Sequence, residues 1–371
     1  MVKKISYVIR THRHGVKKMR QIIVLLLIVG TLLASAAEMP KNGVKKEPPY
    51  VIISIRTDAN EYMRALVEGA KLFAKTIGAE EKVIALYNHG NGEKQVQDLQ
   101  LTLQQTGKNA ILFMDPNDES TARVLANVAK EHGVYFSTVW NKPEDFWPWD
   151  FDPYWVTYTT TDYVNSGTVT AREIFKKMHG KGNILVIQGR LDNSSNKGRV
   201  AGLESVLKKY PDIKVLESLP ANWSRVESAM LVTKWFTKYS DREVQGIWAA
   251  NDEMALGAVD ILREMGLDRK MPICGVDGTS EAVRAVISKE LVCTVSVDPY
   301  WQSGMGLSFA YQAYTGKINP AELPHEKRAF FSKSQLVTSE NAEAFLKHYI
   351  LAPPKIDYSK LWEGKYSRPM Q

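Results

Sequence analysis

The sequence predicts an α/β protein with parallel sheets, divided into two domains. From Pro49 onward, short apolar segments alternate with helical patterns. Strands that alternate with helices form parallel sheets with helices on both faces. The nine strands predicted below exceed the roughly five or six that one compact sheet holds. The length of 371 residues also agrees with two domains or one large one.

Strands are predicted where apolar residues cluster in short runs bounded by polar residues. In chain order these runs are Tyr50–Ile55, Lys82–Tyr87, Ala110–Met114, Val134–Val139, Asn183–Gln188, Lys214–Ser218, Gln245–Ala249, Met271–Val276 and Val292–Val297. Trp155–Asp162 is expected to connect the two domains.

Helices are predicted between these runs, where apolar residues recur three, four or seven positions apart, as they do from Tyr62 to Ile77. Asp58, followed three residues later by Glu61, resembles a capping box at the start of that helix. The predicted helices are Glu61–Ile77, Arg199–Tyr210, Arg225–Tyr239, Glu253–Met265 and Ser280–Lys289.

Seven of the thirteen residues from Phe146 to Tyr158 are aromatic. Two interpretations are open for this stretch. It can be a surface loop that packs on its own aromatic rings, or a lid or wall over a ligand cleft. Further along, the segment after Ala352 is rich in proline and lysine, and we expect residues 351–371 to form a surface tail.

The composition, 44% hydrophobic and 24% charged, excludes collagen, a coiled coil and a wholly disordered chain. The net charge of +7 comes from the first 36 residues, which carry seven basic side chains and no acidic one. Without those seven, 41 basic residues face 41 acidic ones. The rest of the chain is therefore formally neutral, which argues against a nucleic-acid partner.

The first 37 residues have the three parts of a secretory signal peptide. A basic stretch ends at Arg20, the run Ile22–Leu33 is largely apolar, and Ala34-Ser35-Ala36 forms a small-residue cleavage site. A membrane anchor is the alternative, but the apolar run is shorter than the roughly 20 residues that span a bilayer. We therefore expect cleavage near Ala36 or Ala37, a periplasmic mature protein and no membrane insertion afterwards.

The sequence offers no motif for a catalytic or metal centre. It has no Walker loop, G-x-S-x-G, H-E-x-x-H or G-x-G-x-x-G, and the histidines after residue 37 are scattered. We therefore expect no catalytic residue, metal or cofactor. Two cysteines, Cys274 and Cys293, cannot form a disulfide framework. They are either buried small hydrophobic residues or one disulfide pair.

Polar residues follow several of the predicted strands, where open parallel sheets bind ligands. They include Arg56, Asp58, Asn60, Asp115, Asn141, Arg199, Asn251, Asp252 and Asp277, together with Trp140. Planar Asp, Asn and Arg groups can each bind two adjacent hydroxyls, and an indole ring can cover the C–H face of a sugar. The set favours a neutral polyhydroxylated ligand. Each residue also has a structural explanation, because such residues commonly cap helices or form turns.

Several motifs resemble the ribose-binding branch of the type I periplasmic binding proteins. The resemblance covers roughly residues 49–340. It rests on these segments: Ile111 to Asp115-Pro116; Thr161-Asp162 with Gly167; Gln188-Gly189 leading to Arg199 and Gly202; Asn251-Asp252-Glu253-Met254-Ala255-Leu256-Gly257-Ala258; and Gly275-Val276-Asp277-Gly278-Thr279. The fold also forms the effector core of LacI-type repressors, which need an N-terminal helix-turn-helix. Here the apolar export signal takes that place.

The resemblance implies two Rossmann-like lobes with parallel sheets, joined by three crossovers, with a sugar held in the cleft between them. We assign residues 48–161 and 298–330 to the N-terminal lobe. Residues 162–297 and 331–350 are assigned to the C-terminal lobe.

The resemblance also implies a ligand-binding set. Arg199, Asn251 and Asp277 match the family's pattern, and Trp223 stands at an aromatic wall position. The first lobe departs from ribose binders: Met63 replaces one of two aromatic residues, Arg56 adds a charge, and Trp140-Asn141 replaces an Asp-Arg pair. The full predicted set is Arg56, Asn60, Tyr62, Met63, Asp115, Trp140, Asn141, Arg199, Trp223, Asn251, Asp277 and Asp298.

The resulting functional hypothesis is a monomeric periplasmic receptor. It would bind a monosaccharide, polyol or cyclitol such as inositol and deliver it to the permease of an ABC importer. Two alternatives stay open. A secreted enzyme acting on sugars would need a carboxylate pair a few ångströms apart. A sensor module for chemotaxis or signalling would share the same site.

Overall fold

Two sheets organise the chain in the computed structural model, which describes residues 47–352, 355–363 and 365–370. One sheet has seven strands in the order β13-β11-β5-β4-β3-β1-β2, and the other has six in the order β12-β10-β9-β8-β6-β7. We call each sheet with its helices the first and the second lobe. From Pro48 onward the described residues form one compact unit. The predicted signal peptide, residues 1–37, lies outside the described residues.

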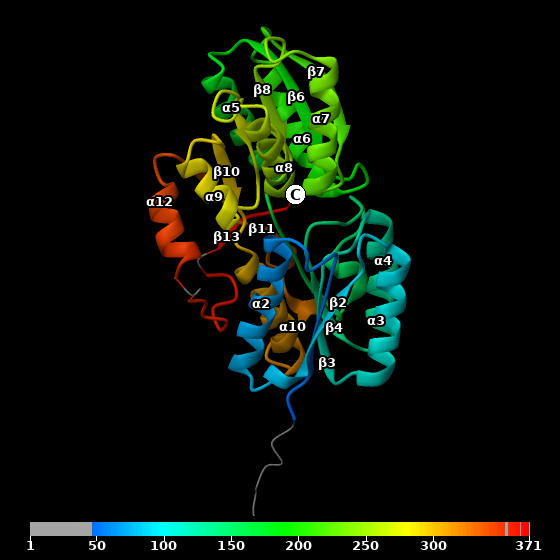
Figure 1. The fold of residues 1–371 in the computed structure, drawn as a ribbon. Helices are drawn as coiled ribbons and strands as arrows, with labels where there is room; N and C mark the ends of the chain where they lie inside the picture. Colours follow the sequence, from blue (N-terminus) through cyan, green and yellow to red (C-terminus); the bar gives the residue numbers. More distant parts are fainter. Residues whose placement is uncertain (1–46, 353–354, 364, 371) are drawn as a thin grey trace, which may run out of the picture. The chain divides into compact units, whose positions relative to one another are not determined.

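The first lobe has helices on both faces of its sheet (Figure 1). Val51 and Ile53 of β1 pack in the core under α2 and α10, whereas Ile52 between them packs in the core under α3 and α4. This alternation is the two-residue period of a strand buried on both faces. The strands are β1 (Tyr50–Ile55), β2 (Val83–Tyr87), β3 (Ala110–Met114), β4 (Tyr135–Thr138), β5 (Trp155–Thr161), β11 (Ala329–Ser332) and β13 (Tyr366–Pro369). The main helices are α2 (Glu61–Thr76), α3 (Gly92–Thr106), α4 (Glu119–Glu131) and α10 (Pro299–Tyr314), with shorter turns η1 (Glu80–Lys82), η2 (Pro148–Phe151), η3 (Pro320–Glu322) and α11 (His325–Arg328).

The second lobe repeats this layering around a single core. Its strands are β6 (Gly182–Gln188), β7 (Ile213–Pro220), β8 (Gly246–Ala249), β9 (Ile273–Cys274), β10 (Cys293–Ser296) and β12 (Gln335–Thr338). Its helices are α5 (Tyr163–Lys177), α6 (Ser194–Leu207), α7 (Arg225–Lys238), α8 (Asp252–Glu264), α9 (Ser280–Ile287), α12 (Ala342–Phe345) and the π-helical turn η4 (Leu346–Ile350). Neighbouring strands are parallel, except that β12 pairs antiparallel with β10 and, in the first lobe, β13 pairs antiparallel with β11.

The chain passes between the two sheets four times, at three short crossovers and then in the longer return from β12 to β13. The first crossover follows β5 at Asp162, the second follows β10 at Val297-Asp298, and the third joins β11 to β12 through Lys333-Ser334. All nine predicted strands are present, which confirms the predicted fold class. The third crossover lies two residues later than the predicted lobe boundary, because β11 continues to Ser332.

Other elements differ from the prediction. Trp155–Thr161, expected to be a connection, is the buried strand β5 before it becomes a crossover. Helix α6 begins at Ser194, five residues before the predicted start. Its first turns contain Ser, Asn and Gly, which have weak helix propensity and therefore resemble a loop.

The C-terminal segment is not a simple surface tail. Tyr358 and Leu361 are buried in the first-lobe core, and β13 extends that lobe's sheet. The segment also contacts all three short crossovers. The Lys333 amide donates to the Lys365 carbonyl at 2.7 Å, Lys365 Nζ lies 2.9 Å from an Asp298 oxygen, and Arg368 Nη2 lies 2.6 Å from an Asp162 oxygen. The prediction was wrong because a four-residue strand that contains Arg and Pro has no apolar signal.

The aromatic stretch packs on itself. Phe146 and Trp155 are buried in the first-lobe core, and the Phe146 and Phe151 rings meet edge to face with 5.1 Å between centroids. The Trp147 and Trp149 rings stack with 5.2 Å between centroids. None of these side chains lines the cleft described below. The structure therefore supports the self-packed loop and not the lid.

Cys274 and Cys293 are free, buried and opposite one another on β9 and β10. This arrangement agrees with the interpretation as buried small residues. Among the described residues, no helix is both long and apolar enough to cross a membrane.

Candidate ligand-binding cleft

A cavity of about 780 Å³ lies where the carboxyl ends of strands from both lobes meet. Parallel strands of both sheets end there, which is where open α/β sheets place ligands. Eleven of the twelve predicted site residues line it: Arg56, Asn60, Tyr62, Met63, Asp115, Trp140, Asn141, Arg199, Trp223, Asn251 and Asp277. The structure thus brings together side chains that are more than 200 positions apart in the sequence. Their contact with a ligand stays a prediction.

Asp298 does not reach this cleft, so its prediction as a site residue requires correction. It lies at the second crossover with a left-handed backbone (φ 49°), and its side chain accepts from the Trp301 amide at 3.1 Å to cap α10. It also pairs with Lys365 and lines a separate cavity at the crossover. The preceding residue, Val297, is buried in the first-lobe core.

Trp140 is held rigidly on the first-lobe side of the cleft. Its backbone is left-handed (φ 62°), and its carbonyl accepts from the Tyr158 hydroxyl at 2.8 Å. Its indole N–H donates to the Tyr62 hydroxyl at 2.6 Å, which in turn donates to Gln302 Oε1 at 2.8 Å. Burial raises the pKa of Tyr62 well above its usual value, so this hydroxyl stays a neutral donor.

Trp223 forms the second-lobe side, and glycine makes room for it. A Cβ atom on Gly189 would lie 2.1 Å from the Trp223 ring, too close for any other residue. Trp223 and the preceding Asn222 both have positive φ angles, which turn the loop into the cleft. The indole N–H donates to Asn193 Oδ1 at 2.8 Å.

Arg199 lies between the two indole rings. Its guanidinium carbon is 5.4 Å from the Trp140 ring centroid and 5.6 Å from that of Trp223, within the range of cation–π attraction. Its Nη1 donates to the Ala250 carbonyl at 2.8 Å, and Nη2 lies 3.8 Å from an Asp277 oxygen. Its Nε is buried with no protein partner. A buried donor without a partner is costly, which makes this atom a candidate ligand contact.

Burial is the largest influence on the pKa of both acidic site residues, Asp277 and Asp115. Burial raises the pKa of Asp277 well above its usual value, although the Arg199 charge and the Asn251 side chain act in the opposite direction. Burial raises the pKa of Asp115 to about 7, against the opposing effects of Arg56 and Asn141. Neither carboxyl is therefore held firmly in its charged form by its protein surroundings.

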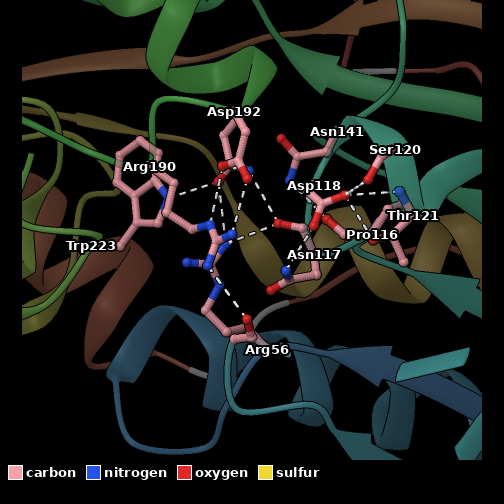
Figure 2. Close-up of polar contacts among 12 residues, drawn as sticks. Arg56, Pro116, Asn117, Asp118, Ser120, Thr121, Asn141, Arg190, Asp192 and Trp223 are labelled. Atoms are coloured by element: carbon pink, nitrogen blue, oxygen red, sulfur yellow. Dashed lines mark hydrogen bonds and ion pairs between the residues drawn. The ribbon is translucent and has the colours of Figure 1, made fainter. Parts of the chain in front are cut away.

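Arg56 crosses the cleft toward the second lobe, as Figure 2 shows. Its Nη2 lies 3.4 Å from the Asn117 carbonyl and 3.2 Å from Asn193 Oδ1, while its Nε is buried without a protein partner. Asn141 donates to the Pro116 carbonyl at 2.8 Å. Both residues are thus oriented by contacts with the protein before any ligand is considered.

Some of the polar residues singled out in the sequence have the structural roles that were the alternative to ligand binding, such as capping a helix. Asn60 accepts from the Met63 amide at 2.9 Å, and Asn251 accepts from the Met254 amide at 3.0 Å, so both cap helices. Asp252 is fully buried and accepts from the Thr279 amide and the Thr294 hydroxyl. Capping uses only the oxygen of each side-chain amide. Asn60 and Asn251 both line the cleft as well.

Hydrogen bonds join the lobes on both sides of the cleft. On one side, Ser194 at the start of α6 donates its backbone N–H to Asn141 Oδ1 at 3.2 Å and its hydroxyl to Glu119 at 2.9 Å. On the other, Ser280 at the start of α9 donates its backbone N–H and hydroxyl to Glu61 at 2.8 and 2.6 Å. The structure therefore has the two lobes closed on each other.

Several residues that line the cleft were not predicted from the sequence. Arg190, Asn193 and Ser195 belong to the loop and first turn between β6 and α6, and His89, Glu253 and Thr279 also line the cleft. Asn193 and Ser195 are buried although they belong to a polar, loop-like stretch. The available signal was the position of this loop after a predicted strand.

Comparison with known proteins agrees with this architecture. A family model described as a periplasmic binding protein domain matches residues 51–318. A xylitol-binding protein of Mycolicibacterium smegmatis is 27% identical over 294 residues, which cover 79% of this chain and 78% of that protein. The D-allose-binding periplasmic protein of Escherichia coli is 25% identical over 275 residues, 74% of this chain and 87% of that protein.

A solved structure is also similar across most of its length. The crystal structure of a twin-arginine translocation pathway signal protein from Burkholderia phytofirmans superposes with a TM-score of 0.83 at 37% identity, covering 86% of this chain and 98% of that one. The two lobes, the three crossovers, the cleft and these matches together show that the chain belongs to the periplasmic binding protein family.

Proposed function

We propose that this protein binds a monosaccharide, polyol or cyclitol between its two lobes and delivers it to the permease of an ABC importer. One observation carries the proposal: planar polar groups and indole rings from both lobes converge on a closed cleft where two buried guanidinium Nε atoms, those of Arg56 and Arg199, have no protein partner. The cavity volume lies within the range typical of small-molecule sites.

The chemistry of the lining supports a polyhydroxylated ligand. Guanidinium, carboxamide and carboxyl groups each offer two polar atoms in one plane, which suits pairs of neighbouring hydroxyls. Trp140 and Trp223 offer apolar ring surface for the C–H bonds of such a ligand. Acidic and basic side chains line the cavity in similar number, which favours a neutral ligand over a charged one.

The arrangement also supports binding by lobe closure. The cleft residues belong to both lobes, so a ligand contacts its full set of partners only when the lobes are closed. A ligand that makes more contacts in one state shifts the population toward that state. The closed form would then be the one that the permease recognises.

The relatives support the ligand class and the cellular location. Xylitol is a polyol and D-allose is a hexose, and both names describe binding proteins. We extend this to a periplasmic protein, cleaved near Ala36 or Ala37, that acts as a monomer and releases its ligand unchanged. A sensor role would use the same cleft, and no feature of the described residues favours it over transport.

A thermal-shift screen of sugars, polyols, cyclitols and sugar acids against the mature protein tests the proposal. At least one neutral polyhydroxylated compound should raise the melting temperature, and calorimetry should give one site per chain. Chromatography should recover the compound unmodified. If only sugar acids bind, or if the compound is converted, the proposal is wrong.

A pair of tryptophan variants locates the site. Trp223→Ala removes one aromatic wall and should weaken binding by a few kcal/mol, by analogy with buried aromatic residues at interfaces. Trp149→Ala is the matched control, because Trp149 stacks on Trp147 and His325 outside the cleft. Equal affinities for Trp223→Ala and the wild type would show that the ligand binds elsewhere.

A further inference from the structure

Asn193 stands at the N-cap position of α6 but does not cap the helix. An N-cap asparagine normally accepts a hydrogen bond from the backbone N–H two or three residues later. Asn60, Asn91 and Asn251 do so at the starts of α2, α3 and α8. Asn193 has the extended backbone of an N-cap, φ −101° and ψ 133°, yet its side chain makes no capping bond. A departure from a local rule of this kind indicates a functional constraint.

The Asn193 side chain instead bonds to groups of both lobes, besides a longer contact of 3.5 Å with Oδ1 of the adjacent Asp192. Its Oδ1 accepts from the Trp223 indole N–H at 2.8 Å and from Arg56 Nη2 at 3.2 Å. Its Nδ2 donates to the Asn117 carbonyl at 3.0 Å. Trp223 belongs to its own lobe, whereas Arg56 and Asn117 belong to the other. The side chain is 1% exposed, so these bonds form away from water.

The opposite lobe binds a different backbone donor at the start of α6. The first backbone N–H of the helix, that of Ser194, donates to Asn141 Oδ1 at 3.2 Å. The two lobes therefore exchange polar contacts: the Asn193 side chain bonds to the first lobe instead of capping its own helix, and Asn141 of the first lobe accepts from the first backbone N–H of that helix. Both contacts are lost if the lobes separate.

We propose that Asn193 is a positioning residue for ligand binding, which couples the orientation of the Trp223 ring to closure of the lobes. This inference rests on the proposed function. When the lobes close, Arg56 and Asn117 hold the Asn193 side chain in place, and its Oδ1 then fixes the indole ring against the ligand. When they open, the side chain is free to cap α6, and the indole loses its partner. A ligand that packs poorly on the Trp223 ring therefore also stabilises the closed state less.

Two substitutions separate the parts of this role. Asn193→Ala removes these bonds and should raise the ligand dissociation rate about tenfold or more, with little change in the association rate, because the bonds to Arg56 and Asn117 exist only in the closed state. Asn193→Asp keeps an acceptor for Trp223 and Arg56 but cannot donate to Asn117. It should leave the ring in place while still raising the dissociation rate.

Asn196→Ala is the matched control. Asn196 is also buried and lies in the first turn of α6, but it contacts only its own lobe, accepting from the Gly189 amide at 2.8 Å and donating to Gln188 at 3.2 Å. It should lower the melting temperature and leave the dissociation rate within about twofold of the wild type. An equal increase for Asn196→Ala and Asn193→Ala would mean that general loosening of the loop explains the effect, and would overturn the proposal.

Fluorine NMR of protein labelled with 5-fluorotryptophan reads the ring directly, with the Trp223 signal assigned by Trp223→Phe. In the ligand-bound state the signal should broaden or shift in Asn193→Ala and stay near its wild-type position in Asn193→Asp. Normal binding kinetics with an unchanged signal in Asn193→Ala would refute the role of Asn193 and leave the proposed function standing. Failure of the wild type to bind any compound in the screen would refute the proposed function, and this inference with it.

Discussion

At the scale of single residues, Asp115 gives the cleft a dependence on pH. Burial raises its pKa from 3.8 to about 7. Between these values the folded protein holds a proton on Asp115 that the unfolded chain has released. The contribution of Asp115 to stability is therefore fully present at low pH and decreases as the pH rises toward 7, by up to about 1.4 kcal/mol per unit.

Asp115→Asn removes this titration, so we expect the stability of the variant relative to the wild type to increase from pH 4 to pH 8. Chemical denaturation of both proteins without ligand, at several pH values, measures the difference. Burial also raises the pKa of Asp277 and Asp252, and the comparison cancels their contribution because both proteins keep them. A difference that does not vary with pH would mean that Asp115 stays ionised in the folded protein.

The site residues that sequence could predict are those whose position follows from a strand end. Asp115, Trp140 and Asp277 come directly after predicted strands, and all three line the cleft. Asn193 could not be predicted in this way, because its role depends on two partners from the other lobe. Asp298 was predicted from the family resemblance, but its side chain caps α10 and lines a separate cavity.

At the scale of elements, the position of Arg199 depends on how closely α5 and α6 approach. A Cβ atom on Gly167 of α5 would lie 1.9 Å from the Arg199 carbonyl oxygen, and one on Gly202 of α6 would lie 2.2 Å from that of Val164. The two helices can therefore pack at this distance only with glycine at both positions. In this chain the two glycines serve helix packing, and neither lines the cleft.

Gly167→Ala should force α6 away from α5 and displace Arg199 from its place between the indole rings. Overpacking of this kind costs about 1–3 kcal/mol of stability, and ligand affinity should fall as well. Asn165→Ala, on an exposed face of the same helix, is the control and should change neither quantity appreciably. Melting temperature and calorimetric affinity measured together test this. A destabilised Gly167→Ala with wild-type affinity would show that Arg199 keeps its place.

Sequence patterns predicted the elements with strong periodicity and missed those stabilised mainly by the fold. The nine apolar runs are all strands, but β11, β12 and β13 are four-residue strands whose pairing partners lie far away in the sequence. Strand β5 contains four threonines and no long aliphatic run, yet each of its residues is buried because strands lie on both sides of it.

At the scale of the whole molecule, the C-terminal segment contacts each of the three short crossovers, so we expect it to restrain the rotation of the lobes about them. Deleting residues 364–371 removes β13 and both ion pairs to the crossovers. We expect the truncated protein to open more readily, with faster ligand dissociation and a larger radius of gyration without ligand. Small-angle scattering and stopped-flow kinetics measure these quantities.

The double variant Lys365→Ala and Arg368→Ala is the control for charge alone. Both ion pairs are partly exposed, and such pairs contribute little, about 0–1 kcal/mol each. The double variant should therefore have a much smaller effect than the truncation, since it keeps the backbone pairing of β13 with β11. If the double variant and the truncation had equal effects, the ion pairs would account for the restraint. If truncation had no effect, the segment would not restrain opening.

The two cysteines allow the local stability of the second lobe to be measured separately. Both thiols are buried on neighbouring strands of that lobe, and the sequence has no other cysteine. A thiol reagent can modify them only in molecules whose second lobe has opened locally or unfolded, so the modification rate reports the free energy of that opening under native conditions. The first lobe has no cysteine, so the modification rate does not report on it. Adding ligand to the reaction would therefore reveal how far occupancy of the cleft stabilises the second lobe, independently of the first.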